Sequence, residues 1–257
     1  MSKLSAADKF IDFSDYGRTL GRWFAKQLVD TRFTPIHVTL LFGVFGLIGV
    51  FFIFKGYYIL AGICIILKSI IDAADGELAR LKKTPSYTGR YLDSVFDIII
   101  NLILIFSICI VAHNNLWIGL LAFVCIELQG TLYNYYYVIL RNKVQGGDTT
   151  SKIFEYKTPI AFPQENQKWV NVLFGAYYFC YGLFDKIIHI LDQDAYKVKI
   201  LPSWFMTCVS IYGLGFQLLI IAIMLSLNLI HFIIPFFIFF TIFMLILIVI
   251  RKLFLPI

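Results

Sequence analysis

Long runs of apolar residues, separated by short polar segments, dominate the pattern of this chain. Each run reaches the length of roughly 20 residues that a helix needs to cross the core of a bilayer. The runs predicted to be membrane-spanning helices cover residues 36–54, 57–79, 91–112, 116–140, 201–227 and 230–250. The fold class that follows is all-α, a polytopic membrane helix bundle with six transmembrane helices.

Residues 5–30 have an amphipathic pattern instead. Basic and apolar positions each recur every four residues, and the two series are out of phase by two residues, which places them on opposite faces of a helix. The basic series is Arg18, Arg22 and Lys26, and the apolar series is Leu20, Phe24 and Leu28. This predicts an N-terminal interfacial helix that lies on an anionic lipid surface.

The segment 169–191 is apolar enough to span a membrane, but it contains Asp185 and Lys186. Lys and Arg residues concentrate in cytoplasmic loops. If 169–191 spanned the membrane, Arg251 and the other Lys and Arg residues that follow this segment would lie on the side away from the cytoplasm. We therefore predict that 169–191 is an extra helix at the cytoplasmic interface, within a cytoplasmic excursion of residues 141–200. Both termini are then cytoplasmic.

Composition agrees with a membrane protein. Of the 257 residues, 60% are hydrophobic and only 15% are charged, and the mean hydropathy is +0.80. These values exclude a soluble globular domain. We predict one membrane domain over 1–257, with four spans within 34–140 and two within 201–254. Membrane lipids are expected partners, and nucleic acid is not.

Four aspartates stand at the junction between the second and third apolar runs. Asp72 and Asp75 are three residues apart, and Asp93 and Asp97 are four apart, so each pair shares one face of its helix. Four unpaired carboxylates at a membrane boundary would repel one another and lose hydration. Divalent cations relieve this cost, and carboxylate oxygens are the ligands that Mg²⁺ and Mn²⁺ prefer. The sequence therefore predicts a metal site here.

The full spacing of this segment is Asp72-x2-Asp75-Gly76-x2-Ala79-Arg80-x8-Gly89-x3-Asp93-x3-Asp97. It resembles the signature of the CDP-alcohol phosphotransferase (CDP-alcohol phosphatidyltransferase) family at every defined position. The resemblance implies an integral membrane transferase that cleaves the pyrophosphate of a CDP-linked alcohol. Such an enzyme transfers the phosphoryl-alcohol part to an acceptor hydroxyl and releases CMP.

The same resemblance implies roles for individual residues. Two ions of Mg²⁺ or Mn²⁺ would be held by Asp72, Asp75, Asp93 and Asp97. Asp97 would also take the proton from the attacking hydroxyl as general base. The CDP moiety would be lined by Gly76, Ala79, Arg80 and Gly89. Family members commonly form dimers, so a homodimer is a further expectation.

The expected reaction is phosphatidyl transfer from CDP-diacylglycerol to a polar alcohol acceptor in phospholipid biosynthesis. The alternative within the family is transfer from CDP-choline or CDP-ethanolamine to diacylglycerol. A non-catalytic membrane scaffold or transporter is the alternative outside the enzyme class, and the intact carboxylate set argues against it. The expected location is a bacterial or archaeal inner membrane, with the active site facing the cytoplasm.

The similarity extends to the entrance of the first apolar run, Thr34-Pro35-Ile36-His37-Val38-Thr39. Ile36 stands where the family usually has Asn, and His37 is a candidate substitute for it. Lys68, one turn before Asp72, is expected to pair with that carboxylate or reach a phosphate, because an intramembrane lysine needs a partner.

Polar residues elsewhere leave alternatives open. Glu127 and Gln129 are expected to hydrogen-bond between helices or to line a cavity, and Asn101 to extend the polar face beyond Asp97. The tyrosines near Arg141 predict an interfacial aromatic belt or, as the alternative, a box for a quaternary ammonium; they are Tyr133, Tyr135, Tyr136 and Tyr137. A phosphorylated acceptor would use the cytoplasmic arginines Arg80, Arg90 and Arg141.

Overall fold

A computed structural model describes residues 10–145, 155–198 and 201–255, and these residues contain helices but no strands. The fold class predicted from the sequence is thereby confirmed as all-α. In chain order the elements are η1 (Phe13–Asp15), α1 (Arg18–Leu28), α2 (Pro35–Phe54), α3 (Tyr58–Lys82), α4 (Tyr87–Val111), α5 (Leu116–Gln145), α6 (Gln167–Leu191), η2 (Ala195–Lys197), α7 (Ser203–Ser210), α8 (Leu214–Ser226) and α9 (Ile230–Phe254).

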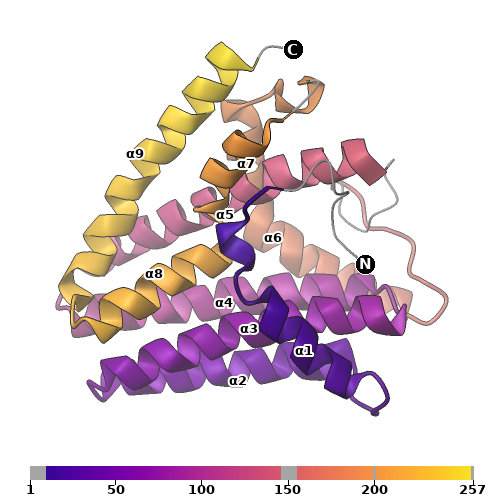
Figure 1. The fold of residues 1–257 in the computed structure, drawn as a ribbon, viewed down its shortest axis with the longest axis horizontal. Coiled ribbons are helices and arrows are strands. Elements are labelled where there is room, and N and C mark those ends of the chain that lie inside the picture. The colour runs from indigo at the N-terminus through magenta and orange to yellow at the C-terminus, as the bar shows by residue number, and fades with distance from the viewer. Residues whose placement is uncertain (1–9, 146–154, 199–200, 256–257) are drawn as a thin grey trace.

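Helix α2 packs against both α3 and α4, and these three helices of alternating direction form one side of the bundle (Figure 1). Helix α8 packs against α3, and α9 packs against α5. Helix α6 contacts α4 and α5, and its first half lies over the beginning of α4. The ends of α3 and α5 and the beginnings of α4 and α6 therefore gather at one end of the bundle.

Four helices in the described residues are long and apolar enough to cross a membrane, namely α2, α4, α5 and α9, and the bent pair of α7 and α8 makes a fifth candidate. Helix α3 has 25 residues, a length of about 37 Å that would cross a membrane. It is not among the four because its charged residues make it less apolar. Helix α6 is not in the group either. A polytopic membrane bundle is confirmed, while the number of six spans and the interfacial position of α6 stay predictions.

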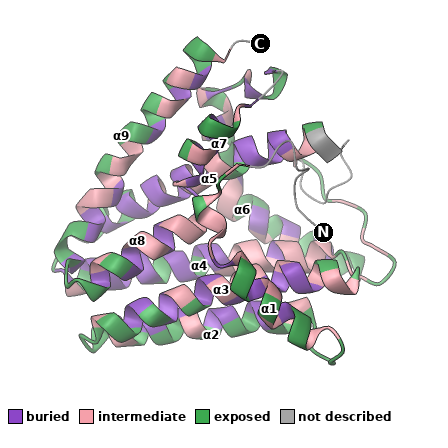
Figure 2. Ribbon diagram, in the orientation of Figure 1, coloured by how far each residue is buried: buried purple, intermediate pink, exposed green. Residues whose placement is uncertain are grey.

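Large apolar side chains are exposed along the outer faces of α2 and α9 (Figure 2). Phe51 on α2 is 54% exposed, and Phe232 and Phe239 on α9 are 63% and 65% exposed. Apolar surface of this extent is unusual on a soluble monomer. It is the surface expected of helices that face lipid.

The predicted single span over 201–227 is instead broken into α7 and α8, which meet at an angle of 45°. The break lies where the N-terminal segment crosses. A Cβ atom on Gly213 would lie 2.2 Å from the Ser14 hydroxyl oxygen, and one on Gly215 would lie 1.9 Å from the Ser14 carbonyl oxygen. Glycine at both positions lets this segment pass against the beginning of α8.

The interfacial helix predicted over 5–30 is shorter in the structure, where α1 has 11 residues and a 3₁₀ turn precedes it; the first five predicted residues lie outside the described chain. A Cβ on Gly21 would lie 2.9 Å from the Ile70 carbonyl oxygen, so α1 crosses α3 at close range. On the outer side, Leu20 and Trp23 are 56% and 63% exposed. This outward apolar side suits contact with lipid.

The tyrosines of α5 do not form the predicted aromatic belt. Tyr136 is fully buried, and its hydroxyl donates to an Asp192 carboxylate oxygen at 2.6 Å. The same oxygen accepts from the Arg251 Nε at 2.7 Å. Tyr135 and Tyr137 are also buried. The belt prediction is wrong because the ends of α6 and α9 and helix α7 pack over this part of α5.

Candidate functional site

A cavity of about 1130 Å³ lies between the helices at the end of the bundle where α3 and α5 finish and α4 begins. Every position of the acidic motif lines it: Asp72, Asp75, Gly76, Ala79, Arg80, Gly89, Asp93 and Asp97. The turn between α3 and α4 brings the two halves of the motif together. Lys83 closes α3 with a left-handed backbone, at φ 53°, and Ser86 caps α4 by accepting a hydrogen bond from the Gly89 N–H at 2.8 Å.

Three of the predicted metal ligands form a compact group. Carboxylate oxygens of Asp72, Asp75 and Asp93 all lie within 4.8 Å of one another. The Oδ1 atom of Asp93 is buried without a hydrogen-bond partner in the described structure. A buried, unpartnered carboxylate oxygen beside two further carboxylates fits a hard divalent cation, whose preferred ligands are oxygens. The donor set therefore fits Mg²⁺ or Mn²⁺.

Asp97 lies outside this group of three and forms an ion pair with Lys68. The Lys68 side chain is 1% exposed, and its ammonium lies 5.0 Å from the centre of the Phe42 ring. This ion pair was not predicted, because the sequence named Asp72 or a phosphate as the partner of Lys68. The lysine reaches across from α3 to α4, whereas Asp72 lies with the other carboxylates.

Thr39 supports the acidic group from α2. Its hydroxyl donates to a carboxylate oxygen of Asp75 at 2.7 Å, and both residues are buried. The sequence carried a signal for this contact in the similarity of the segment around Thr34 to the family, but no role was predicted for Thr39.

His37 is not the predicted substitute for the missing asparagine. Its Nδ1 accepts from the Thr34 backbone N–H at 3.0 Å, and the Thr34 hydroxyl in turn accepts from the His37 N–H, so that the two form a capping box. Exposed at the start of α2, His37 serves the helix end. Ile36 lines the cavity in the position where the family usually has an amide.

Glu77 binds three arginines, which the sequence did not predict. Its carboxylate accepts from the Arg18 Nε at 2.7 Å, from the Arg22 Nε at 3.2 Å and from the Arg80 Nη2 at 2.8 Å. Two members of the basic series, Arg18 and Arg22, thus face α3 rather than lipid head groups alone. The sequence signal for such a contact was the spacing of Arg18 and Arg22 one turn apart, which could have indicated an acidic partner on a neighbouring helix. The contact fixes α1 to the helix that carries the motif and orients Arg80 at the cavity wall.

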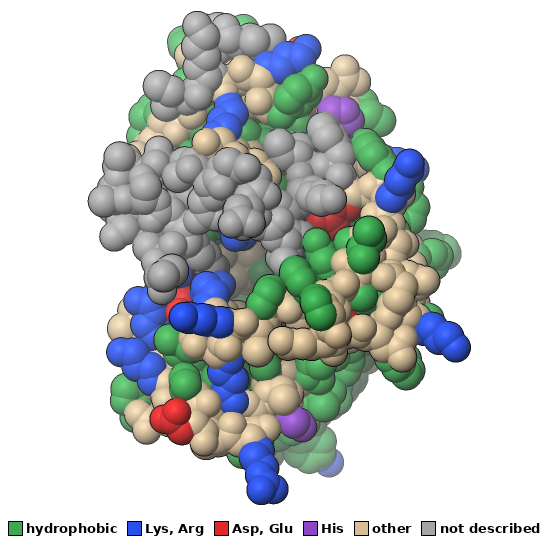
Figure 3. Space-filling model, turned by 90° about the vertical axis from the view of Figure 1, so that its right-hand side faces the viewer, with side chains coloured by type: hydrophobic (Ala, Val, Ile, Leu, Met, Phe, Trp, Pro, Cys, Tyr) green, Lys and Arg blue, Asp and Glu red, His purple; other side chains and the backbone are tan. Residues whose placement is uncertain are grey.

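The cavity mouth is basic. Its cationic lining residues come from the helix ends gathered there: Arg80, Lys82, Lys83, Arg90 and Arg141. The Nε atom of Arg141 is buried without a hydrogen-bond partner in the described structure. Lys and Arg side chains are spread over this face of the molecule (Figure 3). A field of this sign attracts phosphate-bearing ligands.

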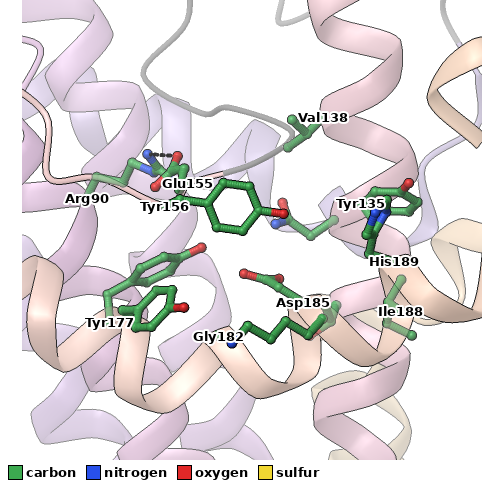
Figure 4. Close-up of a pocket in the computed structure, with 14 residues that line it drawn as sticks. Arg90, Tyr135, Val138, Glu155, Tyr156, Tyr177, Gly182, Asp185, Ile188 and His189 are labelled. Atoms are coloured by element: carbon green, nitrogen blue, oxygen red, sulfur yellow. Dashed lines mark ion pairs between the residues drawn. The ribbon is translucent and has the colours of Figure 1, made fainter. Parts of the chain in front are cut away.

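A smaller side pocket adjoins the mouth, and Arg90, Tyr177 and Asp185 line both spaces. Arg90 forms an ion pair with Glu155 at 2.6 Å, and the Asp185 carboxylate points into the pocket from α6 (Figure 4). The Arg90 guanidinium also lies 5.7 Å from the centre of the Tyr177 ring. The segment before α6 is thereby attached to the beginning of α4.

Glu165 attaches the same segment at a second point. It accepts from the Thr88 backbone N–H at 2.7 Å and from the Ser86 hydroxyl at 2.8 Å. Burial would raise the pKa of the Glu165 carboxyl, but these hydrogen bonds outweigh burial and hold the pKa below its ordinary value. The neighbouring Gly89, a predicted CDP-lining residue, is thus held in a fixed helix end.

The inner end of the cavity is polar but contains no lining cation in the described chain; Asn101, Glu127 and Gln217 line it. Gln129 turns away and donates to the Phe237 carbonyl at 2.9 Å on α9, which confirms the prediction that it bonds between helices. Glu127 takes both predicted roles, because it lines the cavity and accepts from the Asn101 Nδ2 on α4 at 3.4 Å.

A protein-family model described as CDP-alcohol phosphatidyltransferase matches residues 32–255 of the chain. The match includes the whole acidic motif and almost every helix that borders the cavity. A comparison with curated proteins finds no match.

Proposed function

Because the chain belongs to the CDP-alcohol phosphatidyltransferase family, we propose that it transfers a phosphatidyl group from CDP-diacylglycerol to a polar alcohol and releases CMP. As a family member it is a membrane transferase of substituted phosphate groups. The observation that carries the proposal is that all positions of the motif line one cavity with a basic mouth. A scaffold or transporter has no need for this arrangement.

We assign the metal site to Asp72, Asp75 and Asp93, with Asp97 completing a set for two ions. The grouping of the first three carboxylates and the unpartnered oxygen of Asp93 support this assignment. Bound Mg²⁺ or Mn²⁺ would neutralise the pyrophosphate and the charge that develops on the leaving CMP. Thr39 fixes the orientation of Asp75 through its hydrogen bond.

Asp97 acts as the general base that takes the proton from the acceptor hydroxyl. Its ion pair with Lys68 supports this role, because the contact fixes the position of the carboxylate at the cavity wall. A positioned base contributes about 10²- to 10⁴-fold to such a reaction. The arginines at the mouth attract the nucleotide, and Gly76, Ala79, Arg80 and Gly89 line the space for its CDP moiety.

The active site faces the cytoplasm of a bacterial or archaeal cell in this proposal. The supporting observation is the basic character of the cavity mouth, because positively charged loops favour the cytoplasmic side. A soluble acceptor can then reach the mouth from water while the lipid donor enters from the membrane. A homodimer through the spanning helices remains part of the proposal.

The reverse use of substrates, CDP-choline or CDP-ethanolamine with diacylglycerol, is the competing reaction. The test is to incubate purified protein and Mg²⁺ either with CDP-diacylglycerol and a panel of alcohols or with CDP-choline and diacylglycerol. Lipid products are identified by mass spectrometry. We expect products only in the first arm. Products only in the second would reverse the substrate assignment, and no CMP in either arm would contradict the enzyme itself.

A further inference from the structure

Charge changes in the same order along the helices that border the cavity. On α4, Arg90 at the mouth is followed by the motif carboxylates and then by Asn101. On α5, which runs the other way, Glu127 comes first and Arg141 lies near the mouth. The cavity is therefore cationic at its mouth, anionic in the middle and free of lining cations at its inner end in the described residues. A phosphate at the inner end would meet a lining carboxylate and no lining cation among the described residues.

Glu127 is an intramembrane carboxylate that the proposed reaction does not use. It is 5% exposed, and it lines the cavity. Among the described residues, its side chain has one hydrogen bond, from the Asn101 Nδ2 at 3.4 Å. Lys68, the buried cation of this region, is already in an ion pair with Asp97. A buried carboxylate with so little compensation is costly, and such residues in membranes mark functional sites.

The neighbouring amides add acceptors rather than donors. Asn101 donates from its amino group to Glu127, which leaves its Oδ1 as the atom available to a ligand. This Oδ1 is buried without a hydrogen-bond partner in the described structure. Gln217 donates its amino group to the Ile126 carbonyl at 3.1 Å and to the Gln129 Oε1 at 3.2 Å. The polar atoms that Glu127, Asn101 and Gln217 leave to meet a ligand are therefore oxygen acceptors.

We propose that the inner end of the cavity is the binding site for the amino group of the acceptor, and that the acceptor is a small amino alcohol. An ammonium group supplies several donors and a positive charge, which matches the Glu127 carboxylate and the Asn101 Oδ1. Asp97 and Asn101 are one helical turn apart, about 6 Å along α4. A short amino alcohol therefore places its hydroxyl at Asp97 and its amine at Glu127. This inference rests on the proposed function and deepens it.

The test compares Glu127→Gln with wild type in the CMP-release assay, using ethanolamine, L-serine, glycerol and glycerol 3-phosphate as acceptors. Loss of a charged hydrogen bond should raise the KM for the amino alcohol about 10- to 100-fold. The KM for CDP-diacylglycerol should remain largely unchanged. Asp194→Asn is the control, because it neutralises an exposed carboxylate outside the cavity and should leave the acceptor KM unchanged.

Binding is measured separately, by the Tm of wild-type protein in EDTA. Ethanolamine or L-serine should raise the Tm, and glycerol 3-phosphate should not; this comparison needs no variant to fold. CMP release with glycerol 3-phosphate but not with an amino alcohol would overturn the inference and leave the proposed function standing. An unchanged acceptor KM in Glu127→Gln would also overturn it. No CMP with any acceptor would refute the proposed function, and the Tm comparison would still decide the amine site.

Discussion

The Thr39 hydroxyl donates a 2.7 Å hydrogen bond to Asp75 and thereby joins the beginning of α2 to the acidic group on α3. The contact crosses between two helices and is buried at both ends. It fixes the orientation of the Asp75 carboxylate in the proposed metal site. A partner of this kind acts on the metal through its ligand rather than by touching the metal itself.

Thr39→Val should therefore weaken the apparent affinity for Mg²⁺ by about 10- to 100-fold, the usual effect of losing a hydrogen bond to a metal ligand. Valine keeps the shape of the side chain and removes only the hydroxyl. The measurement is the Mg²⁺ dependence of CMP release. Thr39→Ser is the control that restores the hydrogen bond, and equal Mg²⁺ requirements in all three proteins would exclude this role.

Asp97→Asn should reduce phosphatidyl transfer at least about 100-fold, because an amide cannot accept the proton of the attacking hydroxyl. Binding of the CDP-lipid should largely persist, since the group of three other carboxylates is untouched. Turnover and lipid binding are measured on the same preparation. Asp194→Asn, an exposed carboxylate outside the cavity, is expected to keep the wild-type rate. Near-normal turnover in Asp97→Asn would remove Asp97 as the base.

Glu77→Ala should destabilise the protein, because it leaves three arginines around a vanished carboxylate. The Glu77 side chain is 2% exposed, but those of Arg22 and Arg80 are 41% and 35% exposed. Water can compensate these arginines, so we expect a loss of about 2 kcal/mol instead of the 3–5 of a fully buried pair. Thermal unfolding in detergent should show a decrease in Tm of about 4–8 °C. Lys26→Ala on the exposed side of α1 should leave the Tm unchanged.

Glu165 gives the stability of the protein a defined pH dependence. Its folded-state pKa is lowered from the ordinary 4.5, so its hydrogen bonds stabilise the fold fully above that pH. The contribution decreases as the pH falls through the ordinary pKa and then the lower folded one. Wild type should therefore unfold at higher temperature than Glu165→Gln at neutral pH, and the difference should shrink below about pH 4.5. A difference that is independent of pH would assign the effect to packing.

The sequence predicted the membrane bundle and the position of the acidic motif because both depend on local patterns. Apolar runs of spanning length determine helices almost alone. The spacing of Asp72, Asp75 and Asp93 places each carboxylate on a definite helix face. Once α3 and α4 are neighbours, these carboxylates meet without further information.

Contacts between distant segments were not predictable in this way. The apolar run around Gly213 gave no sign of a break, because the break depends on Ser14 from the other end of the chain. The ion pair of Lys68 with Asp97 was not predicted, since sequence spacing shows neighbours on the same helix and not those across the interface. The role of Glu77 was not predictable either, because its partner Arg18 lies on α1 and the sequence does not show that α1 packs beside α3.

The central claim is a metal-dependent transfer that releases CMP, and metal removal tests it most directly. Purified protein is supplied with CDP-diacylglycerol and alcohol acceptors, and CMP is measured before chelation, in EDTA and after adding back Mg²⁺ or Mn²⁺. The carboxylate site predicts that release stops in EDTA and returns with either ion. Full CMP release after rigorous chelation would contradict the account.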